Sequence, residues 1–365
     1  MKKITLFLIL TVCGFVATKA QSILRYTPSL GTGEVYTNLD SAYTDAQDDD
    51  ILYLSGNSYM FTANAIITKR LTWIGAGVHS DSTFATGETI INPINPGSNN
   101  ISFIIRPSAG GSSFSGINFG GFVLNDCDVA GNINLVTFSR CKFVTSYISL
   151  SYNSNYAGSV LNYRFQECIF NTSVQGNGFA SSTSSNITFD NCLFAKGLFR
   201  LRTGAYTFNN SILWGSAPYD FIQQLSGCTF NNSIFWDAAE INLISDGLPT
   251  GNVFNRCVFS HATIPVGSSG TNPTIINNCI ANVTDLFVNT NGNFVYNDND
   301  DYHLVTGSPA LTAAAGGGQC GIYGGTVPAK QGFVPFNPHI SSATIAPATI
   351  NGTLNISIRT TSQSY

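Results

Sequence analysis

The sequence contains little charge. Asp, Glu, Lys and Arg together make up 10% of its 365 residues, and the formal net charge is −4. Proteins that bind nucleic acid concentrate basic residues on one face, so this acidic excess argues against a nucleic-acid partner. Aromatic residues reach 12%. Low charge combined with many β-branched and aromatic residues indicates an all-β extracellular protein rather than a disordered chain.

Long apolar runs are also lacking. No stretch reaches the ~18 consecutive apolar residues typical of a membrane-spanning helix, so we expect no membrane span. The N-terminus has two lysines, a short apolar segment at residues 4–16, and small residues at Thr18 and Ala20. This pattern predicts a secretory signal peptide, residues 1–20, and a secreted chain that is extracellular or at the cell surface. A lipoprotein signal ending at Cys13 is a poorer alternative, because valine precedes that cysteine.

A short motif recurs along the chain: an aromatic or apolar residue, two residues, a Cys or Ser, one residue, and a large apolar residue. Its central position is occupied in turn by Ile117, Cys141, Cys168, Cys192, Ser211, Ser233, Cys257 and Cys279. The mean spacing of about 23 residues is too short for a propeller blade, and a leucine-rich skeleton and helical periodicity are both lacking. The repeat therefore predicts a β-solenoid with three short strands per turn, stacked about 4.8 Å apart.

The central cysteines share one position with Ser and Ile. A catalytic thiol would not recur at a position that accepts isoleucine, so we interpret these cysteines as small buried fillers. Secretion permits disulfides, but stacked strands hold Cβ atoms about 4.8 Å apart, wider than the usual 3.5–4.5 Å. Disulfides within the column are therefore not expected. Cys127, Cys228 and Cys320 lie outside the repeat, and the sequence does not pair them.

Asparagine marks the corner between the two inward-facing parts of the motif, at positions 191, 209–210, 231–232, 255 and 277–278. Asn tolerates left-handed backbone angles and can hydrogen-bond to nearby backbone, which suits a tight corner.

The ends of the coil need covers, because exposed strand edges invite aggregation. Leu39, Ala42, Tyr43 and Ala46 give residues 38–46 one apolar helical face, which predicts an N-terminal capping helix.

At the C-terminus, residues 343–360 alternate around Asn351-Gly352, which predicts a β-hairpin. We expect this tail to cap the last turn or to lie along the solenoid. The resulting division is a signal peptide at 1–20, an N-terminal cap at 21–50, a β-helix at 51–325 and a strand tail at 326–365.

Several segments resemble a known family. They are Asp48-Asp-Asp-Ile-Leu-Tyr-Leu54, Lys69-Arg-Leu-Thr-Trp-Ile-Gly-Ala-Gly77, the Asn-cornered turns, Asp301-Tyr-His-Leu304 and Gly307-Ser-Pro-Ala310. Together they are similar to secreted bacterial right-handed parallel β-helix proteins of the pectate-lyase-like superfamily, over about residues 35–325. The resemblance implies a single-stranded right-handed parallel β-helix. That superfamily includes lyases, hydrolases, epimerases, esterases and surface proteins without a known reaction, so the fold alone assigns no chemistry.

Catalytic residues are not recognisable. Galacturonan hydrolases of the superfamily carry paired aspartates and a Gly-His-Gly, and none of the four histidines here is flanked by two glycines. Lys196, Arg200 and Arg202 form a basic patch that could hold a uronate carboxylate, although a solvated outer strand is the simpler interpretation.

Trp214 and Trp236 each follow the central position by three residues, so we expect them on one face of consecutive turns, where indoles could stack on a sugar. The alternative is that they pack beneath a loop.

Two functions remain open, beside a purely structural surface spacer. The first is a non-catalytic secreted or surface β-helix that binds a polysaccharide or surface glycan, or acts as an adhesin. The second is a polysaccharide lyase, or a related carbohydrate-active enzyme, acting on uronic-acid polymers. We expect a monomer without a cofactor, with calcium at Asp298, Asp300 and Asp301 as a possibility because carboxylates suit that ion. A charged turn is the simpler interpretation of those three residues.

Overall fold

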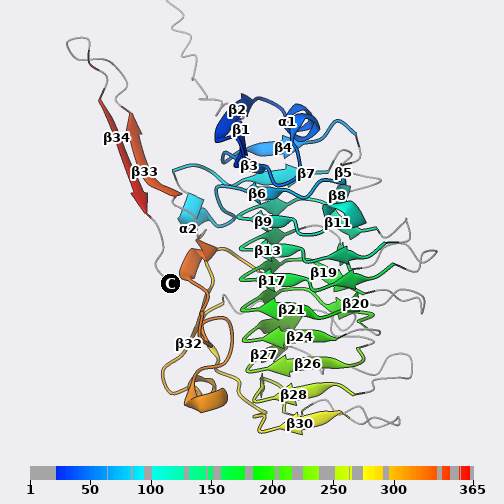
Figure 1. Cartoon of the computed structure of the whole chain (residues 1–365). Helices are drawn as coiled ribbons and strands as arrows, with labels where there is room; N and C mark the ends of the chain where they lie inside the picture. Colours follow the sequence, from blue (N-terminus) through cyan, green and yellow to red (C-terminus); the bar gives the residue numbers. More distant parts are fainter. Residues whose placement is uncertain are drawn as a thin grey trace, which may run out of the picture.

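Short strands stack into a parallel β-solenoid along most of the chain (Figure 1). The structure is a computed structural model, and it describes residues 22–63, 65–83, 85–93, 101–126, 131–144, 147–150, 158–176, 184–201, 205–215, 225–237, 251–262, 264, 274–290, 296–334, 339–345, 353 and 355–361. Helix is confined to short segments, and strands dominate. The prediction of an all-β solenoid is confirmed.

Three long sheets form the walls of the solenoid, and within the described residues they have 12, nine and six strands. Sheet A contains, in spatial order, β2 (Thr32–Tyr36), β1 (Ile23–Thr27), β3 (Ile51–Leu54), β6 (Thr72–Ile74), β9 (Ser113–Ser115), β13 (Thr137–Ser139), β17 (Arg164–Gln166), β21 (Ile187–Asp190), β24 (Tyr206–Asn209), β26 (Cys228–Asn231), β28 (Val253–Asn255) and β30 (Ile275–Asn277). β1 pairs antiparallel with β2 and β3, and the pairs from β3 to β30 are parallel.

Sheets B and C form the other two walls. Sheet B contains β4 (Ser58–Met60), β7 (Ile90–Asn92), β10 (Asn118–Phe119), β14 (Lys142–Phe143), β18 (Ile169–Phe170), β22 (Leu193–Phe194), β25 (Ile212–Gly215), β27 (Ile234–Asp237) and β29 (Val258–Phe259). Sheet C contains β5 (Ile66–Ile67), β8 (Ile101–Ile105), β11 (Phe122–Asn125), β15 (Tyr147–Ser149), β19 (Ser173–Gln175) and β23 (Leu198–Phe199). A short fourth sheet, β12 (Ile133–Asn134), β16 (Val160–Leu161) and β20 (Ser184–Ser185), adds a strand to some turns beyond the three predicted.

Two columns of aromatic rings fill the interior. In sheet A, Phe165 pairs in register with Phe138 and Phe189, and their ring centroids are 5.0 and 4.8 Å apart. The sheet B rings meet this column edge-on, as Phe170 does with Phe165 at 5.6 Å. The sheet A column consists of Trp73, Phe114, Phe138, Phe165, Phe189, Phe208, Phe230 and Phe254. Offset and edge-to-face packing of this kind stabilises aromatic cores beyond simple burial.

The corner between sheets A and B is one residue with a left-handed backbone. Its φ lies between 48° and 54° at Arg140, Glu167, Asn191, Asn210, Asn232, Arg256 and Asn278, and Gly116 takes this position in an earlier turn. The predicted Asn corners are confirmed at Asn191 and in the three Asn-Asn pairs, but the prediction at Asn255 is wrong, because Asn255 lies on β28 and Arg256 makes that corner. In each Asn-Asn pair the second residue makes the corner, and the first stays on the strand of sheet A.

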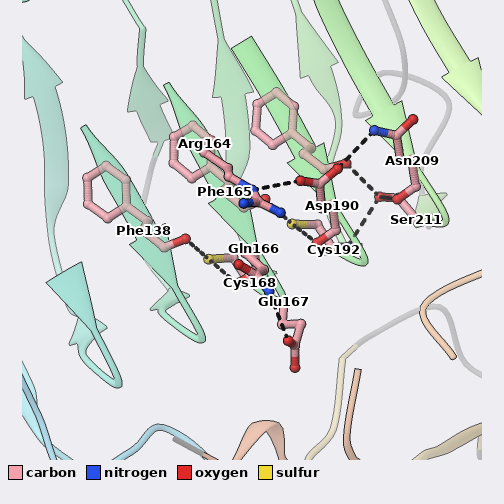
Figure 2. Close-up of polar contacts among 11 residues, drawn as sticks. Phe138, Arg164, Phe165, Gln166, Glu167, Cys168, Asp190, Cys192, Asn209 and Ser211 are labelled. Carbon is pink, nitrogen blue, oxygen red and sulfur yellow. Dashed lines mark hydrogen bonds and ion pairs between the residues drawn. The ribbon is translucent and has the colours of Figure 1, made fainter. Parts of the chain in front are cut away.

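The recurring cysteines are buried and have free thiols at positions 141, 168, 192 and 257. The Sγ of Cys168 donates to the carbonyl of Phe138 at 3.5 Å (Figure 2). Ser211 Oγ donates to the Phe189 carbonyl at the same distance. Cys and Ser are interchangeable here because both are small and donate to the carbonyl of the neighbouring turn. The absence of disulfides in the column is confirmed for these residues, and Cys228 and Cys320 are also free. Cys127 lies outside the described residues.

A helix closes the N-terminal end of the solenoid. Helix α1 (Leu39–Asp45) is capped by Asn38, whose side chain accepts a hydrogen bond from the Ser41 amide at 2.8 Å. Leu39 and Ala42 are buried, and the ring of Tyr43 stacks on Trp73 at 6.2 Å, at the end of the aromatic column. The predicted capping helix is confirmed. Among the described residues, no helix is long and apolar enough to cross a membrane.

After the last turn, residues 296–334 run back along the solenoid towards its N-terminal end, shown in orange in Figure 1. We call them the return segment. Its described elements are β32 (Asp301–Leu304), which pairs antiparallel with β31 (Phe287–Asn289), and the 3-10 helices η2 (Pro309–Leu311), η3 (Ala315–Gly317) and η4 (Gln331–Phe333). It covers the outer face of sheet B, where Ile169, Leu193, Ile212, Ile234 and Val258 are buried. Where sheet B is covered on both sides, as at β18, β22 and β29, its short strands are apolar on both faces, as is usual for strands buried on both faces.

The chain ends in an antiparallel hairpin of β33 (His339–Ile345) and β34 (Ile356–Thr361), as predicted. Its Asn351-Gly352 turn lies outside the described residues. The hairpin stands beside α2 (Ser80–Thr83), near the N-terminal end of the solenoid (Figure 1), so it does not cap the last turn. The remaining short helix, η1 (Pro107–Ala109), follows β8.

Candidate functional site

The two tryptophans expected on consecutive turns are neighbours, as predicted. Trp214 on β25 pairs in register with Trp236 on β27, and their ring centroids are 5.8 Å apart. Tyr302 of the return segment stacks on Trp214 at 5.2 Å, and Phe287 meets Trp236 edge-on at 5.2 Å. Trp214 is consequently only 1% exposed. The structure therefore places the pair beneath a covering segment, which was the alternative interpretation.

Charged groups hold the return segment against sheet B. Lys142 Nζ lies 2.9 Å from Asp298 Oδ1 and 5.0 Å from the centre of the Tyr296 ring. Burial opposes ionisation of Asp298, but the hydrogen bond and charge of Lys142 outweigh it and hold the pKa of this carboxyl below its usual value. Nearer the N-terminal end, Arg140 donates to the Val334 carbonyl.

Arg140 also makes a buried ion pair. Its Nη2 lies 2.9 Å from Glu167 Oε2, and the two side chains are 1% and 0% exposed. Both residues are corner residues with left-handed φ, on consecutive turns, so the stacking of the solenoid brings them together. A buried pair of this kind requires mutual neutralisation, because either charge alone would be very costly inside the protein.

The three aspartates predicted as possible calcium ligands interact with different partners. Asp298 pairs with Lys142, Asp300 accepts from the Tyr302 hydroxyl at 2.9 Å, and Asp301 lies 2.6 Å from His303 Nδ1. Within the described part of the chain, no group of three or more His, Cys, Asp or Glu side chains could hold a metal ion. Calcium binding by these residues stays a prediction.

The basic patch lies elsewhere on the solenoid. Lys196 is half-buried in the turn between β22 and β23, and Arg200 is exposed directly after β23 of sheet C. The guanidinium of Arg200 lies 4.5 Å from the centre of the Phe199 ring. Arg202 is outside the described residues. The tryptophans belong to sheet B, so the patch and the Trp pair are carried by different sheets.

A polar array that the sequence reasoning missed lies on the outer face of sheet A. The asparagines directly before four of the corner residues form a ladder of amide hydrogen bonds: Asn231 donates to Asn209 at 2.9 Å, Asn255 to Asn231 at 2.8 Å, and Asn277 to Asn255 at 2.7 Å. We call these four residues the amide ladder. It continues into Asp190, which accepts from Asn209 at 2.8 Å. The signal was present as the repeated Asn directly after the first Phe or Ile of the motif, but it was interpreted only as a corner.

Asp190 joins the amide ladder to a cation. Arg164 Nε lies 2.9 Å from Asp190 Oδ2, and Asn209 binds the other carboxylate oxygen (Figure 2). A column of threonines runs beside the ladder on the same face, because Thr188, Thr207 and Thr229 pair in register on β21, β24 and β26. In Figure 1 these strands lie at the front of the solenoid. The face is thus a partly exposed array of hydroxyl and amide groups with the spacing of the turns.

Acid and base groups for catalysis do not converge at the hollow between residues 282–285 and 305–309. The residues that line it include one titratable side chain, Asp285. Glycoside hydrolysis of the usual kind needs two facing carboxyl groups. This hollow therefore does not supply that arrangement.

The thiols differ in their state of ionisation. Burial raises the pKa of Cys141, Cys168 and Cys257 well above the usual value, so these thiols stay protonated. Cys279, at the last position of the column, is only partly buried. The hydrogen bond with the Cys257 side chain lowers its pKa to about 7, and the Cys257 amide donates to its sulfur at 3.3 Å.

Comparison of the chain with models of known protein families, with curated proteins and with solved structures finds no match. The structure thus defines the chain as a parallel β-solenoid. The outer face of sheet B is covered, and the outer face of sheet A is polar.

Proposed function

We propose that this chain is a secreted or cell-surface β-helix protein of the pectate-lyase-like superfamily that binds a glycan without cleaving it. The observation that carries the proposal is the amide ladder. The glycan contact is assigned to the outer face of sheet A, because Trp214 is covered by Tyr302. The signal-peptide pattern of residues 1–20 supports secretion.

The amide ladder has hydrogen-bonding capacity to spare. An Asn side chain has two N–H donors and an oxygen with two lone pairs. The bond to the next turn uses one donor and one acceptor site of Asn231. The remaining N–H and lone pair of each Asn can therefore bind sugar hydroxyls. Since the turns repeat about every 4.8 Å, a polymer with a regular repeat could use several of these groups at once.

The ladder also suits a ligand that binds without reaction. Asn and Thr side chains neither ionise nor act as acid or base near neutral pH. The one carboxylate that joins the ladder, Asp190, is neutralised by Arg164. General acid–base catalysis needs titratable groups placed at the reacting bond, so this face supports binding rather than cleavage.

The test is glycan binding by the secreted chain and by an Asn209→Leu/Asn231→Leu variant. Each sugar hydrogen bond contributes about 0.5–1.5 kcal/mol, so we expect the double variant to lose affinity by about tenfold or more. Asn134→Leu is the matched control, because Asn134 belongs to a separate amide ladder in which it accepts from Asn162 at 2.9 Å. Equal binding by all three proteins, or no binding by the wild type on a broad glycan array, would contradict the proposal.

Lyase activity on uronic-acid polysaccharides is the second candidate, and the exposed Arg200, close to Lys196 in the sequence, is the observation that favours it. A guanidinium can hold a uronate carboxylate through two hydrogen bonds. Incubation with pectin and alginate, with and without calcium, should then release unsaturated uronates that absorb in the ultraviolet. Arg200→Gln should abolish that signal. A flat trace under all conditions would remove this candidate.

A further inference from the structure

A lysine and an aspartate from distant parts of the chain meet in a largely buried contact under the return segment. Lys142 Nζ, on β14, lies 2.9 Å from Asp298 Oδ1 across 156 residues, and the two side chains are 11% and 22% exposed. Because Oδ1 is bonded to Cγ, the amine also lies beside the carboxyl carbon. Unlike the guanidinium of Arg140, a lysine amine can lose its proton and act as a nucleophile. The fold therefore holds a nucleophile against a carbonyl carbon.

Tyr296 covers this pair and offers a hydrogen-bond donor. The centre of its ring lies 5.0 Å from Lys142 Nζ. The Tyr296 hydroxyl is buried and has no hydrogen-bond partner among the described residues. Burial and the neighbouring charge of Asp298 raise the pKa of this phenol, so it stays protonated. Tyr296 thus supplies an unused O–H group next to the Asp298 carboxyl.

A second unused polar atom lies on the neighbouring turn of sheet B. Asn118 on β10 pairs in register with Lys142 and is 6% exposed, and its Oδ1 is buried without a hydrogen-bond partner in the described part of the chain. Its Nδ2 donates to Glu88 Oε2 at 3.0 Å, which fixes the orientation of the amide and leaves Oδ1 as a spare acceptor. Buried polar atoms without partners are rare, and a catalytic role is one explanation for them.

We propose that Lys142 and Asp298 join spontaneously in an isopeptide bond, an amide between the two side chains, which ties the return segment covalently to sheet B. The reaction begins when a proton passes from Nζ to the carboxylate within their hydrogen bond. Burial lowers the cost of this transfer, because it disfavours both charges. The lone pair of the neutral amine then attacks Cγ, and the Nζ–Cγ bond forms. The carbonyl oxygen takes up the negative charge and accepts a hydrogen bond from Tyr296.

The second step releases one water. A proton passes from the nitrogen to the hydroxyl group on Cγ, the Cγ–O bond breaks, and the amide remains. No atom is oxidised or reduced, so the reaction needs no further reactant. The ionised pair is the resting state, because the hydrogen bond and charge of Lys142 outweigh burial and hold the pKa of Asp298 below its usual value. The bond therefore accumulates after folding, and the freshly folded chain still carries the free carboxyl.

Intact mass spectrometry of the folded chain from residue 22 to residue 365 tests the proposal. After prolonged incubation at pH 7, the chain should be lighter than its sequence by one water. Tryptic digestion should yield the peptide of residues 141–164 joined to that of residues 257–330. The linked chain should also migrate faster on a denaturing gel, because the bond closes a loop of 156 residues. An unchanged mass would overturn the proposal, and so would a loss of water without joined peptides, since an aspartyl succinimide also loses water.

Variants separate the reaction from the ion pair. Lys142→Arg keeps a positive charge at this position but cannot form the bond, and Asp298→Ala removes the carbonyl carbon, so neither should lose water. Lys330→Arg is the matched control, because this lysine of the return segment lies outside the pair, and its chain should link at the wild-type rate. Circular dichroism establishes that each variant is folded. A joined pair of peptides that persists in Lys142→Arg would contradict the assignment.

The rate of linking tests the role of Tyr296. Tyr296→Phe keeps the ring over the amine and removes only the hydroxyl. It should slow the appearance of the linked chain about a hundredfold, because the oxyanion loses a hydrogen-bond donor. A merely structural role of the ring would leave the rate unchanged, and that result would overturn the mechanism.

Discussion

The buried ion pair between Arg140 and Glu167 gives a sharp test of how the solenoid is held together. The two groups are 2.9 Å apart and essentially inaccessible to solvent. Glu167→Gln removes one charge with almost no change of shape and leaves the Arg140 guanidinium buried without its counter-charge. Breaking a buried pair in this way costs about 3–5 kcal/mol. We expect the free energy of unfolding of this variant to fall by that amount.

The chain supplies a matched control. Arg70 and Asp49 form an ion pair at 2.6 Å, but their side chains are 48% and 66% exposed. Asp49 also has a left-handed φ, 72°, so Asp49→Asn and Glu167→Gln change charge at similar backbone positions. Exposed pairs contribute little to stability, because water screens them. The control should therefore cost far less than Glu167→Gln.

Urea unfolding followed by circular dichroism measures both losses. A double variant, Arg140→Met/Glu167→Met, removes both charges, and replacement of a buried pair by apolar residues is often neutral. It should be more stable than either single Met variant, although it also loses the hydrogen bond from Arg140 to the Val334 carbonyl. If Glu167→Gln costs no more than Asp49→Asn, burial does not set the strength of this pair and the reasoning fails.

Three further outcomes are expected. Phe189→Ala should destabilise the fold by about 3–5 kcal/mol and Phe189→Leu by less, as measured by urea unfolding, because the ring is buried between two stacked neighbours. Cys279 should react with iodoacetamide increasingly as the pH rises through about 7, whereas Cys168 should stay unlabelled in the folded protein; equal labelling by mass spectrometry would contradict this. Asp298→Asn should cost stability at pH 7. The pKa of Asp298 is lower in the folded than in the unfolded chain, so its ionised form stabilises the fold. The difference in thermal stability between wild type and variant should therefore persist above pH 5 and vanish as the pH falls through the folded pKa, which lies below 3.8. A difference that does not depend on pH would count against the Lys142 contact.

The periodic part of the fold could be predicted from the sequence. A repeat near 23 residues places like side chains in columns, so the positions of Phe165, Cys168 and Asn191 relative to the next turn followed from their spacing alone. The same register placed Trp214 beside Trp236. The capping helix and the hairpin were predictable as well, because their patterns are local.

Tertiary structure alone decided what covers each face. The return segment has no repeat, and its partners are far away in the chain: Asp298 meets Lys142 across 156 residues, and Val334 meets Arg140 across 194. No spacing rule connects such positions, so the sequence left open whether Trp214 faces solvent or a covering segment. The amide ladder required coordinates for another reason: adjacent asparagines look alike in sequence, and only the backbone angles distinguish the one at the corner from the one on the strand. Periodicity thus determines which residues stack, and long-range packing determines which of the stacked residues remain accessible to a ligand.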